Sequence, residues 1–113
     1  MSDTTVEEIQ VDIDEAKETI DVMKSLDRLM QNPDFKKIIK QGYFVDESAR
    51  LVGLKAAPQM QAPERQAAMI KAIDGIGSLQ QHFNMIWVMG NQAESMLENA
   101  DIALEEMALE GEI

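Results

Sequence analysis

The chain of 113 residues contains no cysteine, three prolines, six glycines and five aromatic residues. The absence of cysteine excludes a disulfide framework, a thiolate metal site and a thiol nucleophile. So few prolines and glycines disfavour a many-stranded sheet, whereas the abundant Ala, Leu, Met, Glu, Gln and Lys favour helix. No apolar run approaches the roughly 20 residues that span a bilayer, and the acidic N-terminus does not resemble a signal peptide. We therefore expect one soluble, all-α domain over residues 1–113.

Basic residues are missing from the C-terminal part of this acidic chain, whose formal net charge is −11. Residues 1–22 hold eight acids and one base, residues 23–73 hold five acids and nine bases, and residues 74–113 hold eight acids and no Lys or Arg. The overall acidity argues against nucleic-acid or anionic-membrane partners. We interpret both acidic ends as solvated helix faces.

An apolar repeat with alternating spacings of three and four residues runs through the last third of the chain. Its members are Met69, Ala72, Ile76, Leu79, Phe83, Ile86, Gly90, Ala93, Leu97, Ala100, Leu104 and Met107. A mean spacing of 3.5 residues keeps one stripe of a helix facing one partner over many turns. Pro63 and Glu64 suit a first helical turn, so the pattern predicts a helix over 63–109 that packs lengthwise. The helix seam is expected to centre on Ile76, Leu79, Phe83, Ile86, Leu97 and Leu104.

The rest of the chain predicts a broken helical arm. The expected segments are disordered residues 1–5, a helix over 6–31, short helices over 33–41 and 43–56, and a loop over 57–62. Thr5 and Asn32 are expected to cap the helices that follow them, and Gly42 to end the helix before it in the left-handed conformation. We expect this arm to fold back on the long helix as an antiparallel helical hairpin or coiled coil, with the two short helices forming a head.

The polar residues do not form a recognisable catalytic, metal or cofactor motif. His82 has no carboxylate three or four residues away on its helix, and no glycine pattern matches a phosphate-binding loop. One helical face carries a ladder of carboxylates: Glu94, Glu98, Asp101 and Glu105. Hard cations usually take ligands from a loop or from several elements, so we interpret this acidic face as solvated. The sequence predicts a protein that is not an enzyme and that has no cofactor or metal.

A mildly basic stretch offers an alternative interpretation. Its residues are Lys36, Lys37, Lys40, Arg50 and Lys55, with Phe35, Tyr43 and Phe44 nearby. The density of bases is low for nucleic-acid binding. We interpret the aromatic residues as core and the lysines as helix caps that balance charge, and a DNA-handling role as the weaker alternative.

The segment from Met85 to Met89 is apolar around the whole helix, because Met85, Trp87, Val88 and Met89 lie beside the repeat rather than on it. A helix that is apolar on all sides is buried on all sides. Either the head helices cover this segment or another molecule does. Since Trp and Met are enriched at interface centres, we identify these four residues as a candidate partner interface, with Trp87 foremost.

Three segments resemble a group of small helical proteins of tailed bacteriophages: NPDFKKIIKQGYF at 32–44, ESARLVGL at 47–54 and AIDGIGSLQQHF at 72–83. The group is associated with head and virion assembly genes and has no established activity. The resemblance implies a non-enzymatic structural or assembly protein, such as a scaffold, connector or accessory virion component. Its expected partners are itself or other phage virion proteins, and its expected location is the host cytoplasm or the virion. The alternative hypothesis is an acidic nucleic-acid mimic that inhibits a host enzyme.

Overall fold

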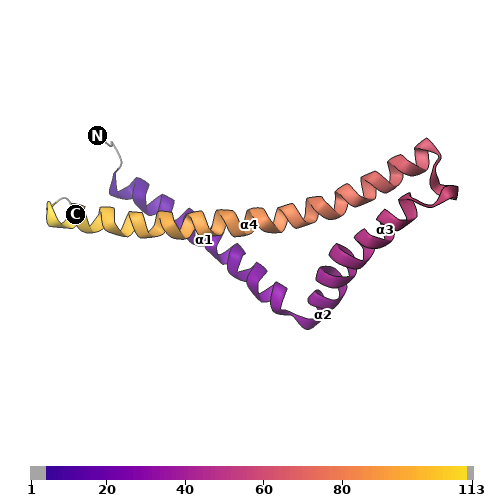
Figure 1. Ribbon diagram of the computed structural model, residues 1–113. Coiled ribbons are helices and arrows are strands. Elements are labelled where there is room, and N and C mark those ends of the chain that lie inside the picture. The colour runs from indigo at the N-terminus through magenta and orange to yellow at the C-terminus, as the bar shows by residue number, and fades with distance from the viewer. Residues whose placement is uncertain (1–4, 112–113) are drawn as a thin grey trace. The chain divides into compact units, whose positions relative to one another are not determined.

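The computed structural model describes residues 5–111, which are almost entirely helical and include no strand. The predicted all-α fold is confirmed. The elements are α1 (Val6–Gln31), α2 (Pro33–Phe35), the π-helix η1 (Lys36–Glu47), α3 (Ser48–Lys55), the 3₁₀ turn η2 (Pro58–Met60) and α4 (Pro63–Leu109) (Figure 1). The bounds of α4 coincide with the predicted 63–109. Within residues 5–111, no helix combines the length and apolar character needed to cross a membrane.

Side-chain caps fix the starts of the first two helical segments. The Thr5 hydroxyl accepts a hydrogen bond from the Glu8 amide at 3.1 Å, and the Thr5 amide donates to the Glu8 carboxylate at 3.2 Å. This reciprocal capping box confirms Thr5 as the cap of α1. Asn32 Oδ1 accepts from the amides of Asp34 and Phe35 at 2.9 and 3.1 Å, as predicted. Disorder is expected for residues 1–5, of which residues 1–4 lie outside the described residues. Thr5 is described, and its backbone and side chain are hydrogen-bonded in the capping box.

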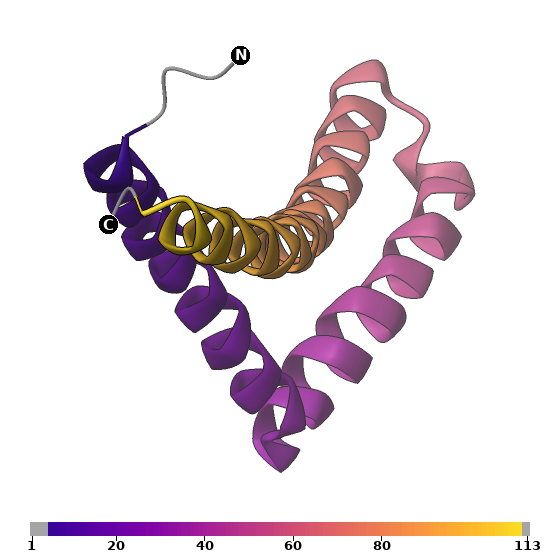
Figure 2. The same ribbon diagram turned by 90° about the vertical axis from the view of Figure 1, so that its left-hand side faces the viewer.

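The expected helix end at Gly42 was wrong. Segments α2, η1 and α3 follow one another without interruption from Pro33 to Lys55 (Figure 2). Among the described residues, only Gly111 has a positive φ, so Gly42 does not form a left-handed cap. Instead Gly42 lies inside the π-helix, where a Cβ would stand 3.1 Å from the carbonyl oxygen of Lys37, five residues earlier. The stretches predicted as helices 33–41 and 43–56 therefore belong to one continuous helical segment.

The wide turns of η1 align two phenylalanines that an α-helix would separate. Phe35 and Phe44 are nine residues apart, which is about two turns of a π-helix but two and a half turns of an α-helix. Both rings approach Phe83, with centroid distances of 6.0 Å each. These three half-buried rings form one aromatic contact with α4, to which Phe35 contributes from the end of α2 and Phe44 from the π-helix. The π-helical turns thus place Phe35 and Phe44 on one face, where aromatic pairing adds to burial.

The chain forms two compact units. The helix-pair unit comprises residues 1–26 and 85–113, and the middle unit comprises residues 27–84. In the middle unit, Leu51 of α3 and Met69 and Ile76 of α4 are buried. Ala72, expected in the seam, is exposed, whereas Ile73 is half-buried. The buried side of the middle unit therefore includes Ile73, which lies off the strict 3–4 repeat, and leaves out Ala72, which lies on it.

A glutamine closes the chain reversal of the middle unit. Gln66 Nε2 donates to the carbonyl oxygen of Lys55 at 2.9 Å and to that of Met60 at 2.8 Å. The amide thereby satisfies a carbonyl at the end of α3 and another at the end of η2. The predicted loop over 57–62 therefore contains a 3₁₀ turn and connects directly to the first turn of α4.

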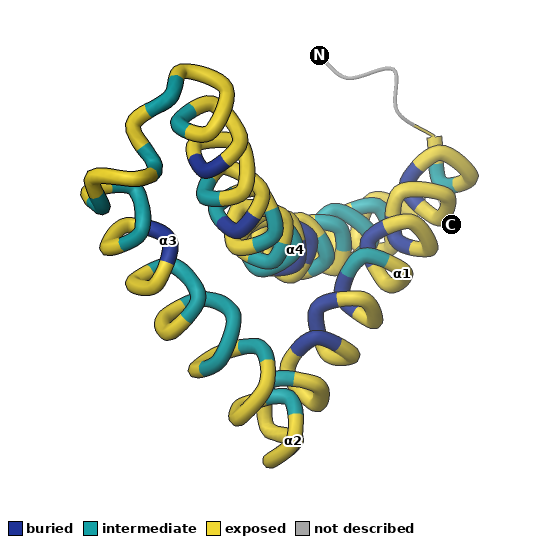
Figure 3. The backbone as a smooth tube through the Cα atoms, turned by 90° about the vertical axis from the view of Figure 1, so that its right-hand side faces the viewer, coloured by how far each residue is buried: buried dark blue, intermediate teal, exposed yellow. Residues whose placement is uncertain are grey.

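In the helix-pair unit, α1 and the C-terminal part of α4 run antiparallel with their buried faces together (Figure 3). The buried side chains of α1 recur every three or four residues: Ile9, Ile13, Ala16, Ile20, Met23 and Leu26. A stripe of this period is what an amphipathic helix presents to one neighbour. The pairing expected between the two ends of the chain is therefore present within this unit.

Candidate interaction surface

The core of the helix-pair unit is small. Ala16, Ile20 and Met23 of α1 form a cluster with Ala93 of α4, and Ile86, Trp87 and Leu97 pack against it. Gly90 is also buried, and a Cβ at this position would come within 2.6 Å of the Met23 Cβ. Glycine at this point permits the two helices to approach closely.

The predicted partner interface divides between covered and uncovered residues. Met85, Val88 and Met89 are exposed, with 52%, 45% and 49% of their accessible surface free. Trp87 is half-buried, because it packs against the α1–α4 core. The large apolar surface that the sequence indicates is therefore carried by the methionines and Val88 rather than by Trp87. Among the seam residues, Ile76 is buried, while Leu79, Phe83, Ile86, Leu97 and Leu104 are half-buried.

One side of the α1–α4 seam forms an apolar groove that the sequence analysis did not identify. We call it the methionine groove. Its floor is Ala16 and Ala93. Met89, Gln92 and Met96 line it on α4, and Glu15 and Thr19 line it on α1. Met96 leaves 41% of its surface exposed. The spacing of Met85, Met89 and Met96 on one helix face was the available signal, but only the placement of α1 creates the opposite wall.

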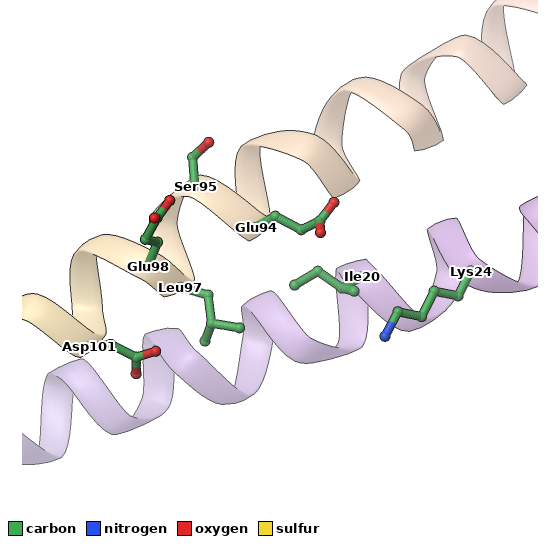
Figure 4. A pocket seen from close by; sticks show the side chains of 7 residues that line it. All are labelled: Ile20, Lys24, Glu94, Ser95, Leu97, Glu98 and Asp101. Atoms are coloured by element: carbon green, nitrogen blue, oxygen red, sulfur yellow. The ribbon is translucent and has the colours of Figure 1, made fainter.

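The other side of the seam is an acidic groove, shown in Figure 4. Leu97 and Ile20 lie between the helices, while Glu94, Glu98 and Asp101 line the α4 side. Lys24 adds one cation from α1. Glu105, the fourth member of the predicted acidic face, is exposed on the same helix.

No group of three or more His, Cys, Asp or Glu side chains within residues 5–111 is arranged to hold a metal ion. His82 is exposed, and its ring lies 6.2 Å from that of Phe83. The structure therefore places the lone histidine beside the aromatic contact of the middle unit.

In the basic stretch, Lys36, Lys37 and Lys40 are exposed on the π-helix. Arg50 forms a bidentate pair with Glu47, at 2.6 and 2.8 Å. This hydrogen bonding lowers the pKa of the Glu47 carboxyl and raises the pKa of Arg50. Both side chains are solvent-accessible, so the pair contributes little to stability. Phe35, Tyr43 and Phe44 are half-buried, in agreement with the interpretation of these rings as core.

The chain matches no protein-family model, no curated protein and no solved structure.

Proposed function

We propose that this chain is a non-enzymatic structural or assembly protein of a tailed bacteriophage, acting through helix-mediated self-association or partner binding. One observation carries the proposal: Met85 and Val88 leave about half of their surface exposed beside the core of the helix-pair unit. Contiguous exposed apolar surface is typical of protein interaction sites. The resemblance of segments 32–44, 47–54 and 72–83 to phage proteins supports the biological setting.

The first test is light scattering of the purified protein at tens of micromolar. We expect an oligomer that the double substitution Met85→Gln/Val88→Gln dissociates, because each change removes exposed apolar area without altering the core. Ile102→Gln serves as the matched control, since Ile102 is an equally exposed apolar residue on α4, more than three turns from Val88. A strict monomer, or equal effects of both variants, would argue against self-association.

Mass spectrometry of purified virions tests the assembly role. A structural or accessory component is expected at a fixed copy number per virion, and a scaffold in assembling particles only. Absence from both virions and assembly intermediates would refute the proposal.

The acidic groove favours a second candidate, an acidic mimic of nucleic acid that occupies the basic groove of a host nuclease or polymerase. Three carboxylates from Glu94, Glu98 and Asp101 line that groove. Charge reversal of these residues should then abolish a salt-sensitive inhibition. A structural protein tolerates the same reversals but loses its packing when Leu97 or Leu104 becomes Asp.

A further inference from the structure

We propose that the methionine groove binds a basic amphipathic helix of a partner protein. The inference rests on the proposed function and names the chemistry of the partner. The floor of the groove consists of two alanines, Ala16 and Ala93, whose small side chains allow a partner side chain to reach the seam. On α4 the groove is lined by Gln92 and by Met89 and Met96, and the unbranched, polarisable side chains of the two methionines adapt to different apolar shapes.

The length of the apolar surface fits a helix. Met85, Met89 and Met96 follow one another at four and seven residues, so they lie within about 40° on one face of α4. Met96 follows Met85 by eleven positions, a distance of about 16 Å along the helix axis, or three helical turns. A partner helix with apolar anchors at three- and four-residue spacing presents a stripe of the same length.

Charge selects the kind of helix. The helix-pair unit holds fifteen Asp and Glu residues but only two lysines, Lys17 and Lys24. Lys24 lines the acidic groove, and Lys17 lies two turns earlier on the same face of α1. Neither lysine therefore neutralises the methionine groove, where Glu15 stands. Lys and Arg residues that flank the apolar stripe of a partner helix would complement the negative charge of Glu15.

The same charge excludes other occupants. Packing of two helix-pair units groove to groove would bring Glu15 of both copies into one interface that no lysine lines, which like-charge repulsion opposes. Self-association through Met85 and Val88 does not require that pairing, because neither residue lines the groove. Anionic lipid and nucleic acid are repelled for the same reason. A positively charged helix with an apolar face can both pack against the methionines and complement the charge of Glu15.

The probe is a fluorescein-labelled helical peptide of about 18 residues, with leucines at alternating spacings of three and four and lysines elsewhere. Two control peptides accompany it: one with Glu in place of Lys, and one of the same composition with the leucines scrambled. Fluorescence anisotropy against the full chain measures the dissociation constants. We expect only the amphipathic lysine peptide to bind, more weakly as salt rises.

Variants then locate the binding site. Met89→Gln/Met96→Gln should raise the dissociation constant about tenfold or more, as expected for loss of central apolar contacts, whereas Ile102→Gln should leave it unchanged. Glu15→Lys should weaken binding more than Glu98→Lys, which reverses a charge in the opposite groove. Circular dichroism checks that each variant keeps its helix content.

Any one of three results would overturn the inference. The glutamate peptide could bind as tightly as the lysine peptide, or Met89→Gln/Met96→Gln could leave the dissociation constant of the lysine peptide unchanged. The third such result is an equal change of that dissociation constant in Glu15→Lys and Glu98→Lys. An oligomer of the chain that buries this groove, and that the peptide does not displace, would assign it to a second copy and refute the partner helix. The outcome is distinguishable from that of the proposed function, because the measurements differ. Peptide binding is measured by anisotropy with Met89→Gln/Met96→Gln, self-association by light scattering with Met85→Gln/Val88→Gln, and the virion role by copy number.

Discussion

The close approach of α1 and α4 at Gly90 makes Gly90→Ala a sharp test of the helix-pair packing. Two effects oppose each other. Alanine favours an α-helix over glycine by about 1 kcal/mol. Against this, the new Cβ would lie 2.6 Å from the Met23 Cβ, and such overpacking costs about 1–3 kcal/mol. Because Cβ itself is in the way, Met23 cannot relieve the contact by changing its rotamer. We expect a net loss of stability of up to about 2 kcal/mol.

The same helix supplies the control. Gly75 also lies within α4, and a Cβ there would meet no atom within 4 Å. Gly75→Ala should therefore raise the free energy of unfolding by about 1 kcal/mol. Since the propensity gain is common to both variants, their difference isolates the overpacking term of about 1–3 kcal/mol, or a gap in melting temperature of about 4–12 °C. Thermal and urea unfolding followed by far-UV circular dichroism measures it. If Gly90→Ala raised the melting temperature as much as Gly75→Ala, the close approach of the two helices would be refuted.

Two further predictions concern the middle unit. Asn32→Ala should lower the free energy of unfolding by about 1 kcal/mol in urea denaturation, because two amides at the start of α2 lose their acceptor; an unchanged midpoint would contradict this cap. The Glu47 carboxyl should titrate below its ordinary pKa in NMR, and Arg50→Gln should raise that pKa toward the ordinary value. Because the folded pKa is lowered, the contribution of the pair is present above the ordinary carboxyl pKa and is lost as pH falls through the folded pKa. Identical Glu47 titration in both proteins would exclude the pair in solution.

The helix boundaries show how far local signals reach. Thr5, Asn32 and Pro63 each act within three or four residues, by capping free amides or by restricting one backbone angle. Such effects need no tertiary contact, and the predicted starts of α1, α2 and α4 agree with the structure. The apolar 3–4 repeat likewise predicts α4 through its whole length, because its period is a property of the helix itself.

The π-helix shows where local reasoning fails. Sequence reasoning that assumes an α-helix predicts a helix end at Gly42. In the structure the helix continues through Gly42 as a π-helix. The competing influence is tertiary: Phe35 and Phe44 both reach Phe83 only when the helix between them is wide. The contact partner of these rings lies about 40 residues further along the chain. No local pattern therefore predicts the change of helix type.

The amino-acid sequence by itself determined that this protein is helical, where its first and last long helices begin, and which stripe of α4 is apolar. These properties follow from backbone hydrogen bonding and residue periodicity within a few turns. Only the tertiary structure decided which apolar residues outside that stripe are covered. Trp87 and Met89 are two residues apart, and the sequence assigns both to one interface. With α1 packed along one side of α4, Trp87 joins the core while Met89 lines an open groove. A stripe on one helix cannot specify the groove, because half of its wall belongs to another helix.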